Sequence, residues 1–337
     1  MKKALMIIAI VVLVIVLGGI GIFYYYTGRL QQNNAVEIVE KPVETPQQLV
    51  LGTLDPSSIT PSPTPEPTPT AHPIYAVDTI NENIINILLV GIDPRSEDAN
   101  AESTGNSDSM MLVSYNSKNG TIKLVSLMRD SWVKINGTRW GRLNTAFNSG
   151  GAGSLINTVN LCFDLDVQYY AAVSFSVFEE LIDQIGGVTV NLTKQEASFI
   201  NGKMGRRVLE PKDGPVLLDG ELALWYARCR ADSDGDFSRT ARQRHLMELL
   251  YQSMKTDANL KKLSGIASYA VENVTTNLSL DMMLQLGTSV LTSDMTIESY
   301  HLPFDGTWHY ADKDGASVLS IDLEANAAEL NRILYGE

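Results

Sequence analysis

Three short apolar runs in the first half of the globular region have the pattern of buried β-strands. They are Asn86–Ile92, Met110–Tyr115 and Thr121–Leu127. A nearly continuous apolar run of this length predicts a strand inside a core. Asn119-Gly120 separates the second run from the third, and this dipeptide favours a type I′ turn because both central positions need positive φ. The pattern therefore predicts a β-hairpin beside a further strand.

Helical spacing of apolar positions characterises the second half of the chain. The segment Ser174–Ile185 ends at Gly186-Gly187, a helix-ending pair, and is followed by the strand-like Val188–Leu192. Glu221–Arg230 (ELALWYARCR) is predicted to pass from a helical turn into a strand. Further helices are predicted at Ser238–Lys255 and Asn326–Leu334. This alternation of strands and helices is typical of the α/β class.

The amino terminus has the pattern of a transmembrane anchor. Ala4–Tyr26 contains no charged residue, and about 20 apolar residues span a bilayer as a helix. Lys2 and Lys3 are expected to hold residues 1–3 in the cytoplasm. A cleavable signal peptide is the alternative, but the run is long for one and lacks a small-x-small cleavage site. We expect a single-pass protein of the cell membrane with an extracellular carboxyl-terminal domain.

Residues 27–80 show no sustained apolar period and are interpreted as an extracellular linker. Thr60–Pro73 reads TPSPTPEPTPTAHP, and alternating proline favours an extended, semi-rigid chain. A docking ligand for another protein is the alternative interpretation of such a stretch. The globular domain is predicted to occupy residues 81–337, because no second linker follows.

The charge of the chain excludes one class of partner. A formal net charge of -13 over 337 residues argues against nucleic acid, which is bound by dense Lys and Arg surfaces. An anionic ligand would have to meet a local concentration of arginine. The two cysteines, Cys162 and Cys229, could form one disulfide or remain two thiols, and free buried thiols are the favoured interpretation.

One edge of the predicted sheet gathers charged side chains. A turn on Asn119-Gly120 would set Met110 opposite Arg129, so that Asp108 is the diagonal neighbour of Arg129. The loop from Asp93 to Ser107 returns to the same edge. The edge therefore collects Asp93, Arg95, Asp108 and Arg129. The alternative is that these aspartates are ordinary solvated turn residues.

A second cluster is rich in arginine. Seven of the 13 arginines lie between Arg206 and Arg244. In a strand, Arg228 and Arg230 would share one face, with Cys229 turned into the core. The segment from Asp236 then opens a helix on which Arg239, Arg242 and Gln243 share a face. A helix amino terminus surrounded by arginines favours phosphate, although a solvated helix face is the alternative.

The two clusters suit pyrophosphate chemistry. Two aspartates can hold Mg²⁺ together with phosphate oxygens, while arginines neutralise charge on a leaving phosphate. No Cys cluster or HExxH motif accompanies the four histidines, so a zinc site is not expected. A serine nucleophile elbow, a Walker loop and a GxGxxG motif are also missing from the sequence.

At this point the chain resembles the LytR-CpsA-Psr family of cell-wall phosphotransferases. The motifs are NILLVGIDPR, NSDSMMLVSYN, IKLVSLMRDSWVKING, LIDQIGGVTVNL, LLDGELALWYARCR and DFSRTARQ, in this order. The resemblance implies a three-layer α/β/α single domain with a central mixed sheet, preceded by the membrane helix. It also implies a pocket that holds a polyprenyl pyrophosphate, with the lipid tail in an apolar tunnel. Met128 stands where members often carry proline.

The resemblance also implies roles for individual residues. The metal ligands for Mg²⁺ would be Asp93 and Asp108. The catalytic set would be Asp93, Arg129, Arg228, Arg230 and Asp236. Pyrophosphate would be bound by Arg95, Arg129, Arg228, Arg230, Arg239, Arg242 and Gln243, of which Arg95 and Arg242 are included for their proximity.

The implied activity is transfer of a phosphate-linked glycan to a wall polymer. The glycan, a teichoic acid, capsule polysaccharide or similar polymer, would move from undecaprenyl pyrophosphate to a peptidoglycan hydroxyl, releasing undecaprenyl phosphate. Two alternatives remain open. One is a non-catalytic module that tethers lipid-linked glycan or regulates envelope synthesis, which would not need both aspartates. The other is a pyrophosphate hydrolase, in which water replaces the acceptor.

Overall fold

The computed structural model describes most of the chain after residue 71. The described residues are 38–39, 72–92, 107–232, 234–256, 266, 269–270 and 272–336, with gaps at 280, 284, 287–288 and 290–294. The predicted anchor at 4–26 and most of the predicted linker lie outside them. In the part of the chain that the structure describes, no helix is long and apolar enough to cross a membrane.

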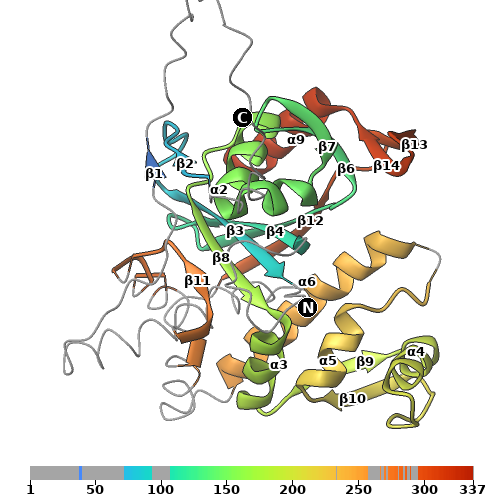
Figure 1. Ribbon diagram of the computed structural model, residues 1–337. Coiled ribbons are helices and arrows are strands. Elements are labelled where there is room, and N and C mark those ends of the chain that lie inside the picture. The colour runs from blue at the N-terminus through green and yellow to red at the C-terminus, as the bar shows by residue number, and fades with distance from the viewer. Residues whose placement is uncertain are drawn as a thin grey trace, which may run out of the picture.

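A six-stranded mixed sheet forms the centre of the fold (Figure 1). Its order is β11 (Thr275–Thr276), β8 (Tyr169–Ser174), β3 (Ile84–Ile92), β4 (Ser107–Asn116), β5 (Thr121–Leu127) and β12 (Thr296–Leu302). β4 pairs antiparallel with both β3 and β5, whereas β3 pairs parallel with β8 and β5 pairs parallel with β12. The three strands predicted from apolar runs are therefore confirmed as β3, β4 and β5.

Helices cover both faces of this sheet. One face carries α2 (Asn144–Phe163) and α9 (Leu323–Tyr335), and the other carries α3 (Phe175–Gln184), α5 (Gly220–Ala227) and α6 (Gly235–Thr256). Successive side chains of β4 enter opposite cores, because side chains alternate along a strand. Met110 and Leu112 pack on the first face, and Met111 and Val113 on the second. The arrangement has the three layers that were expected.

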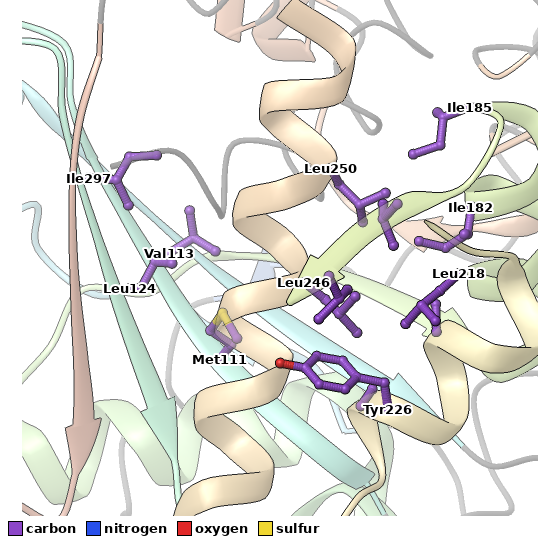
Figure 2. Close-up of a cluster of buried hydrophobic side chains, with 14 of the residues drawn as sticks. Met111, Val113, Leu124, Ile182, Ile185, Leu218, Tyr226, Leu246, Leu250 and Ile297 are labelled. Carbon is purple, nitrogen blue, oxygen red and sulfur yellow. The ribbon is translucent and has the colours of Figure 1, made fainter. Parts of the chain in front are cut away.

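The second core brings α6 against the sheet. Figure 2 shows Met111 and Val113 of β4 near Leu246 and Leu250 of α6, with Tyr226 of α5 close by. These side chains are at most 5% exposed. The predicted helices at Ser174–Ile185, Ser238–Lys255 and Asn326–Leu334 are confirmed as α3, α6 and α9.

Two smaller sheets flank the core. One pairs β9 (Val188–Leu192), which was predicted, with β10 (Gly214–Leu218), and α4 (Lys194–Met204) lies between them in sequence. The other has the order β13 (Trp308–Lys313), β14 (Ala316–Ile321), β6 (Ser131–Ile135) and β7 (Arg139–Arg142). The β13–β14 hairpin was not predicted, and it becomes important below.

The turn between β4 and β5 corrects the predicted register. Asn116 pairs with Thr121, so the turn has four residues, 117–120, rather than two. Only Gly120 has positive φ, at 64°, whereas a type I′ turn needs two such residues. The predicted pairing of Met110 with Arg129 is wrong by two positions. A register shift of two residues keeps each side chain on its expected face of the sheet, because side chains alternate between the two faces with a period of two residues.

The connection from α5 to α6 corrects a second prediction. The segment 221–230 does not pass into a strand, because α5 continues to Ala227 and Arg228 is its carboxyl-terminal cap. The Asp219 carboxylate accepts a hydrogen bond from the backbone N–H of Leu222 at 2.9 Å and fixes the start of the helix. Cys229 nevertheless points into the protein and is fully buried, as the strand interpretation required.

Residues 72–80, which lie inside the predicted linker, are packed against the domain. The backbone N–H of His72 donates to the Gly150 carbonyl at 3.0 Å, and that of Tyr75 donates to Asn157 Oδ1 at 2.9 Å. Ile74, in β2 (Ile74–Tyr75), is fully buried against the α2 side of the core. β2 also pairs with β1 (Ile38–Val39). Residues 72–80 therefore belong to the fold rather than to the linker.

A conservative substitution tests this boundary. Ile74→Val should lower the free energy of unfolding by about 0.5–1.5 kcal/mol, because it leaves a methylene-sized void in a closed core. The melting temperature should fall by a few degrees, about 2–4 °C per kcal/mol for a domain of this size. Ile80→Val is the matched control, since Ile80 is 41% exposed and should tolerate the change. If both variants had the same melting temperature, residues 72–80 would have to be assigned to the linker and not to the domain.

Candidate functional site

A cavity of about 490 Å³ lies between the central sheet and the helices α3, α5 and α6. Its wall is mostly apolar and is built from both the sheet and the helices. Contributing side chains include Leu89, Met111, Val173, Phe178, Leu181, Leu246 and Leu250. The volume falls in the range of ligand-binding pockets, and an apolar wall with few polar groups is typical of them. The cavity lies where the resemblance implied a tunnel among strands and helices.

The polar part of the cavity wall is dominated by arginine. Arg129 follows β5, Arg228 and Arg230 follow α5, and Arg239 lies in the first turns of α6. Gln243, one helical turn after Arg239, also lines the cavity and accepts a hydrogen bond from Ser109 Oγ at 2.9 Å. The structure therefore brings together five of the predicted pyrophosphate-binding residues at one cavity, from three separate segments.

The carboxylate of Asp236 contacts three of these four arginines. Its carboxylate lies 2.8 Å from Arg230 Nη2, 2.9 Å from Arg239 Nη2 and 3.5 Å from Arg129 Nε. Three like charges repel one another, and a shared carboxylate offsets that repulsion while fixing their positions. Asp236 also occupies the first turn of α6, where an acidic residue is favourable. A catalytic role for Asp236 stays a prediction, whereas its contacts are those of a residue that positions others.

Arg228 lies over two aromatic rings. Its guanidinium carbon lies 4.8 Å from the centre of the Phe175 ring and 5.4 Å from that of Trp225. Such stacking restrains a long side chain and so helps to fix the position of its guanidinium group at the cavity. The sequence analysis did not identify Phe175 or Trp225. The spacing of Trp225 and Arg228 on one helix, three residues apart, was the available signal.

Arg242 was predicted to bind pyrophosphate, but the structure places its side chain away from the cavity wall. Nε donates to Glu196 at 2.6 Å, Nη1 donates to the Cys229 carbonyl at 3.0 Å, and Nη2 pairs with Asp232. These bonds join α4, the α5–α6 connection and α6. Arg242 therefore fixes the segment that carries Arg228 and Arg230. Helical spacing alone could not separate it from Arg239 and Gln243.

Part of the predicted site lies in the segment between β3 and β4. Asp93 and Arg95 lie outside the described residues, and of Asp108 only the backbone, in β4, is described. Ile92 pairs with Ser107 and Gly91 with Ser109, so Asp108 is the extra residue of a β-bulge. Bulges of this kind redirect a side chain and are frequent beside active sites.

The bulge lies at the cavity, because both Gly91 and Ser109 line it. Within the described ranges, no three His, Cys, Asp or Glu side chains are grouped so that they could share a metal ion. Mg²⁺ needs only one or two carboxylates when phosphate oxygens complete its shell, so position 108 beside the arginines fits the predicted ion. The magnesium site itself stays a prediction.

The two cysteines are free thiols, as favoured from the sequence. Burial raises the pKa of the Cys162 thiol to about 11 and also raises the pKa of the Cys229 thiol. A thiol that resists ionisation is a poor nucleophile. Neither cysteine is therefore a candidate for covalent chemistry.

Comparisons with known proteins converge on one group. The model of the LytR_cpsA_psr family matches residues 61–332. The chain is 32% identical over 235 residues to the polyisoprenyl-teichoic acid–peptidoglycan teichoic acid transferase TagU of Halalkalibacterium halodurans, covering 69% of this chain and 73% of the relative. It is 31% identical over 240 residues to TagU of Bacillus mycoides, covering 69% of this chain and 75% of the relative.

Solved structures agree with these relatives. A structure of TagT bound to LI-WTA matches with a TM-score of 0.62 and 26% identity, over 76% of this chain and 90% of that one. The crystal structure of Bacillus subtilis TagV matches with a TM-score of 0.58 and 26% identity, over 76% of this chain and 98% of that one. The mixed α/β fold is thus shared with these proteins.

Proposed function

Because the chain belongs to the LytR-CpsA-Psr family, we propose that it is a transferase that moves a phosphate-linked glycan from a polyprenyl pyrophosphate carrier to a peptidoglycan hydroxyl. The glycan is a teichoic acid, a capsule polysaccharide or a similar polymer, and undecaprenyl phosphate is the released product. The names of the relatives support this assignment, since TagU is named as a teichoic acid transferase acting between a polyisoprenyl-linked donor and peptidoglycan.

The observation that carries the proposal is the contact between an apolar cavity and an arginine cluster. A polyprenyl pyrophosphate has an apolar chain attached to two charged phosphates, and the cavity wall offers matching surfaces in the same order. A guanidinium group can donate two hydrogen bonds to the oxygens of one phosphate. The two phosphates can therefore be bound by four such groups, those of Arg129, Arg228, Arg230 and Arg239. An apolar cavity without these arginines would suit a neutral lipid instead.

The proposed reaction is a single displacement at phosphorus. The acceptor hydroxyl oxygen forms a bond to the phosphorus that carries the glycan, and the bond from that phosphorus to the bridging oxygen breaks. The electron pair leaves with polyprenyl phosphate, where the arginines stabilise the added charge. The hydroxyl proton passes to a nearby carboxylate, Asp93 or a neighbour. Asp236 keeps three of the arginines in place throughout.

Mg²⁺ is part of the proposal, with Asp93 and Asp108 as its protein ligands. When bound there it would supply further charge neutralisation to the pyrophosphate. Arg95, in the same loop, is proposed as an additional phosphate contact. We also propose that residues 4–26 anchor the chain in the cell membrane, so that the domain works outside the cell beside its lipid substrate and its wall acceptor.

The proposal is tested by following both products. The full-length chain in detergent is incubated with a lipid-linked glycan, with and without peptidoglycan. Transfer predicts glycan attached to peptidoglycan and an equal amount of undecaprenyl phosphate, with both products depending on the acceptor. Release of undecaprenyl phosphate at the same rate without peptidoglycan would indicate hydrolysis. Tight binding of the lipid without either product, in the presence of a competent acceptor, would indicate a tethering module.

A further inference from the structure

A ladder of aromatic rings lies beside the arginine cluster and takes no part in the contacts described above. The aromatic ladder consists of Phe237 in α6 and of Trp308 and Tyr310 in β13. The Trp308 ring stacks on the Phe237 ring with centres 4.9 Å apart at 26°, and Tyr310 meets Trp308 edge to face at 5.2 Å. His301, at the end of β12, packs on Phe237 at 5.2 Å. Trp308 and Tyr310 share one face of the strand because they are two residues apart.

The ladder is joined to the site at two points. Phe237 directly follows Asp236, the carboxylate that bridges Arg129, Arg230 and Arg239. On the other side, the backbone N–H of Leu319 in β14 donates to the Asp130 carbonyl at 2.9 Å, next to Arg129. The β13–β14 hairpin therefore contacts two of the three segments that carry the arginines, the segment after β5 and α6. None of the three rings lines the apolar cavity.

The exposure of the ladder argues against a purely structural role. Tyr310 is 70% exposed, so its ring adds little to the core. β13 is an edge strand with no buried residue, which leaves this side of the sheet open to a long molecule. Phe237 and Trp308 are half-buried behind it, so the ladder presents one exposed tyrosine on a fixed aromatic base next to the site. A tyrosine ring combines an apolar face with a polar hydroxyl, which is typical of binding surfaces. Pyranose rings, which have apolar C–H faces and polar rims, match both properties.

The charge of the surface around the ladder indicates which saccharide of the proposed reaction it binds, the donor glycan or the acceptor chain. Residues 305–315 carry three acidic residues, Asp305, Asp312 and Asp314, against two basic ones, His309 and Lys313. These side chains lie at exposed positions. A glycan that repeats phosphate groups would be repelled by this surface, whereas a neutral saccharide chain would not. In the proposed function the donor is already held by its lipid and pyrophosphate, whereas none of the residues assigned so far would bind the acceptor.

We infer that the aromatic ladder Phe237–Trp308–Tyr310 binds the acceptor, as the neutral N-acetylhexosamine chain of the wall polymer. This inference rests on the proposed function, because it names where the acceptor of that reaction is held. Rings of the ladder stack on pyranose faces and present a hydroxyl of the chain to the phosphorus held at Arg129, Arg230 and Arg239. The cavity holds the lipid, the arginines hold the pyrophosphate, and the ladder holds the acceptor.

The test uses the full-length chain in detergent and soluble peptidoglycan strands that keep their stem peptides, because removing the peptides would free a lactyl carboxylate on every second sugar and make the glycan chain anionic. Tyr310→Ala should raise both the dissociation constant for the strands and the acceptor KM by about tenfold, the loss expected for one stacked ring. At saturating acceptor, kcat should be unchanged, as should the affinity for bare polyprenyl pyrophosphate. Tyr310→Phe should retain most of the binding because it keeps the ring.

Trp140 provides a matched control. It is 50% exposed and lies on β7, the opposite edge strand of the same sheet. Trp140→Ala should leave strand binding and acceptor KM unchanged. Trp308→Ala is the second test variant, with its melting temperature measured beside that of wild type, because it also removes the stack on Phe237.

The outcomes separate the inference from the proposed function. Unchanged strand affinity and acceptor KM in Tyr310→Ala would overturn the inference and leave the transferase assignment intact. An increased KM for the lipid-linked donor, with an unchanged acceptor KM, would also overturn it and assign the ladder to the donor glycan. Strand binding that depends on Tyr310, in a wild-type chain that transfers nothing, would support the ladder as a saccharide site and reject the transfer.

Discussion

Asp108→Asn is expected to lower the turnover of glycan transfer by at least about a hundredfold while the chain stays folded. Asparagine has nearly the same size and keeps much of the hydrogen-bonding capacity, but it removes the charge with which Asp108 would hold Mg²⁺ in the proposed mechanism. The backbone supports this choice, because Asp108 is the extra residue of the bulge next to Ser109, which bonds Gln243 at the cavity. Lipid binding should persist, since the arginines remain.

The measurement is release of undecaprenyl phosphate in the presence of peptidoglycan, for wild type and Asp108→Asn, with and without Mg²⁺. Chelation should stop the wild-type reaction without changing its melting temperature, and added Mg²⁺ should restore it. Asp78→Asn is the control, since Asp78 is exposed and precedes β3. Equal release in all four conditions would remove the metal from the mechanism.

Arg230→Ala and Arg228→Ala are each expected to weaken binding of polyprenyl pyrophosphate by about one to two decades, or about 1.5–3 kcal/mol. Both guanidinium groups line the cavity. Arg230 is the simpler case, because its side chain is 43% exposed and pairs with Asp236, so the melting temperature should change little. Arg228→Ala also removes the stack on Phe175 and Trp225, and should therefore cost some stability.

Two controls define this second experiment. Arg230→Lys should give an intermediate affinity, because lysine keeps the charge but loses the planar fork. Arg207→Ala should have no effect, since Arg207 pairs with Glu210 on the surface. Cys229→Ala should show the opposite pattern, lower stability with normal binding, because Cys229 is fully buried. If Cys229→Ala lost binding and the two arginine variants did not, the pyrophosphate would contact the opposite side of the segment 228–230 and the proposed site would be wrong.

The sequence was most informative where local patterns decide the outcome. Apolar runs predicted β3, β4 and β5, and helical spacing with its end signals predicted α3, α6 and α9. The ordered motifs identified the family, which the family comparison confirmed. The register of the hairpin was wrong because Asn119-Gly120 suits more than one turn. The choice was made by a four-residue turn that closes on Asn116 and Thr121.

Local sequence patterns could not predict which side chains contact one another. Arg239, Arg242 and Gln243 have equivalent spacing, yet Glu196 and Asp232 bind Arg242 on one side of α6 while the other two reach the cavity. Which side a guanidinium takes depends on the carboxylates that packing brings near it. The same holds for Asp236, predicted as a catalytic residue and found between three arginines contributed by separate segments.

The sequence by itself thus determined the class of fold, several of its strands and helices, and most of the arginines that meet at the cavity. Hydrophobic periodicity and helix-end signals depend on a few neighbouring residues, so they can be recognised without knowledge of the rest of the chain. Only the tertiary structure decided the register, the partner of each arginine and the stacking of Phe237 on Trp308. Those contacts join residues far apart in sequence, and they form only when burial of both faces of the sheet has fixed how the helices and the β13–β14 hairpin pack.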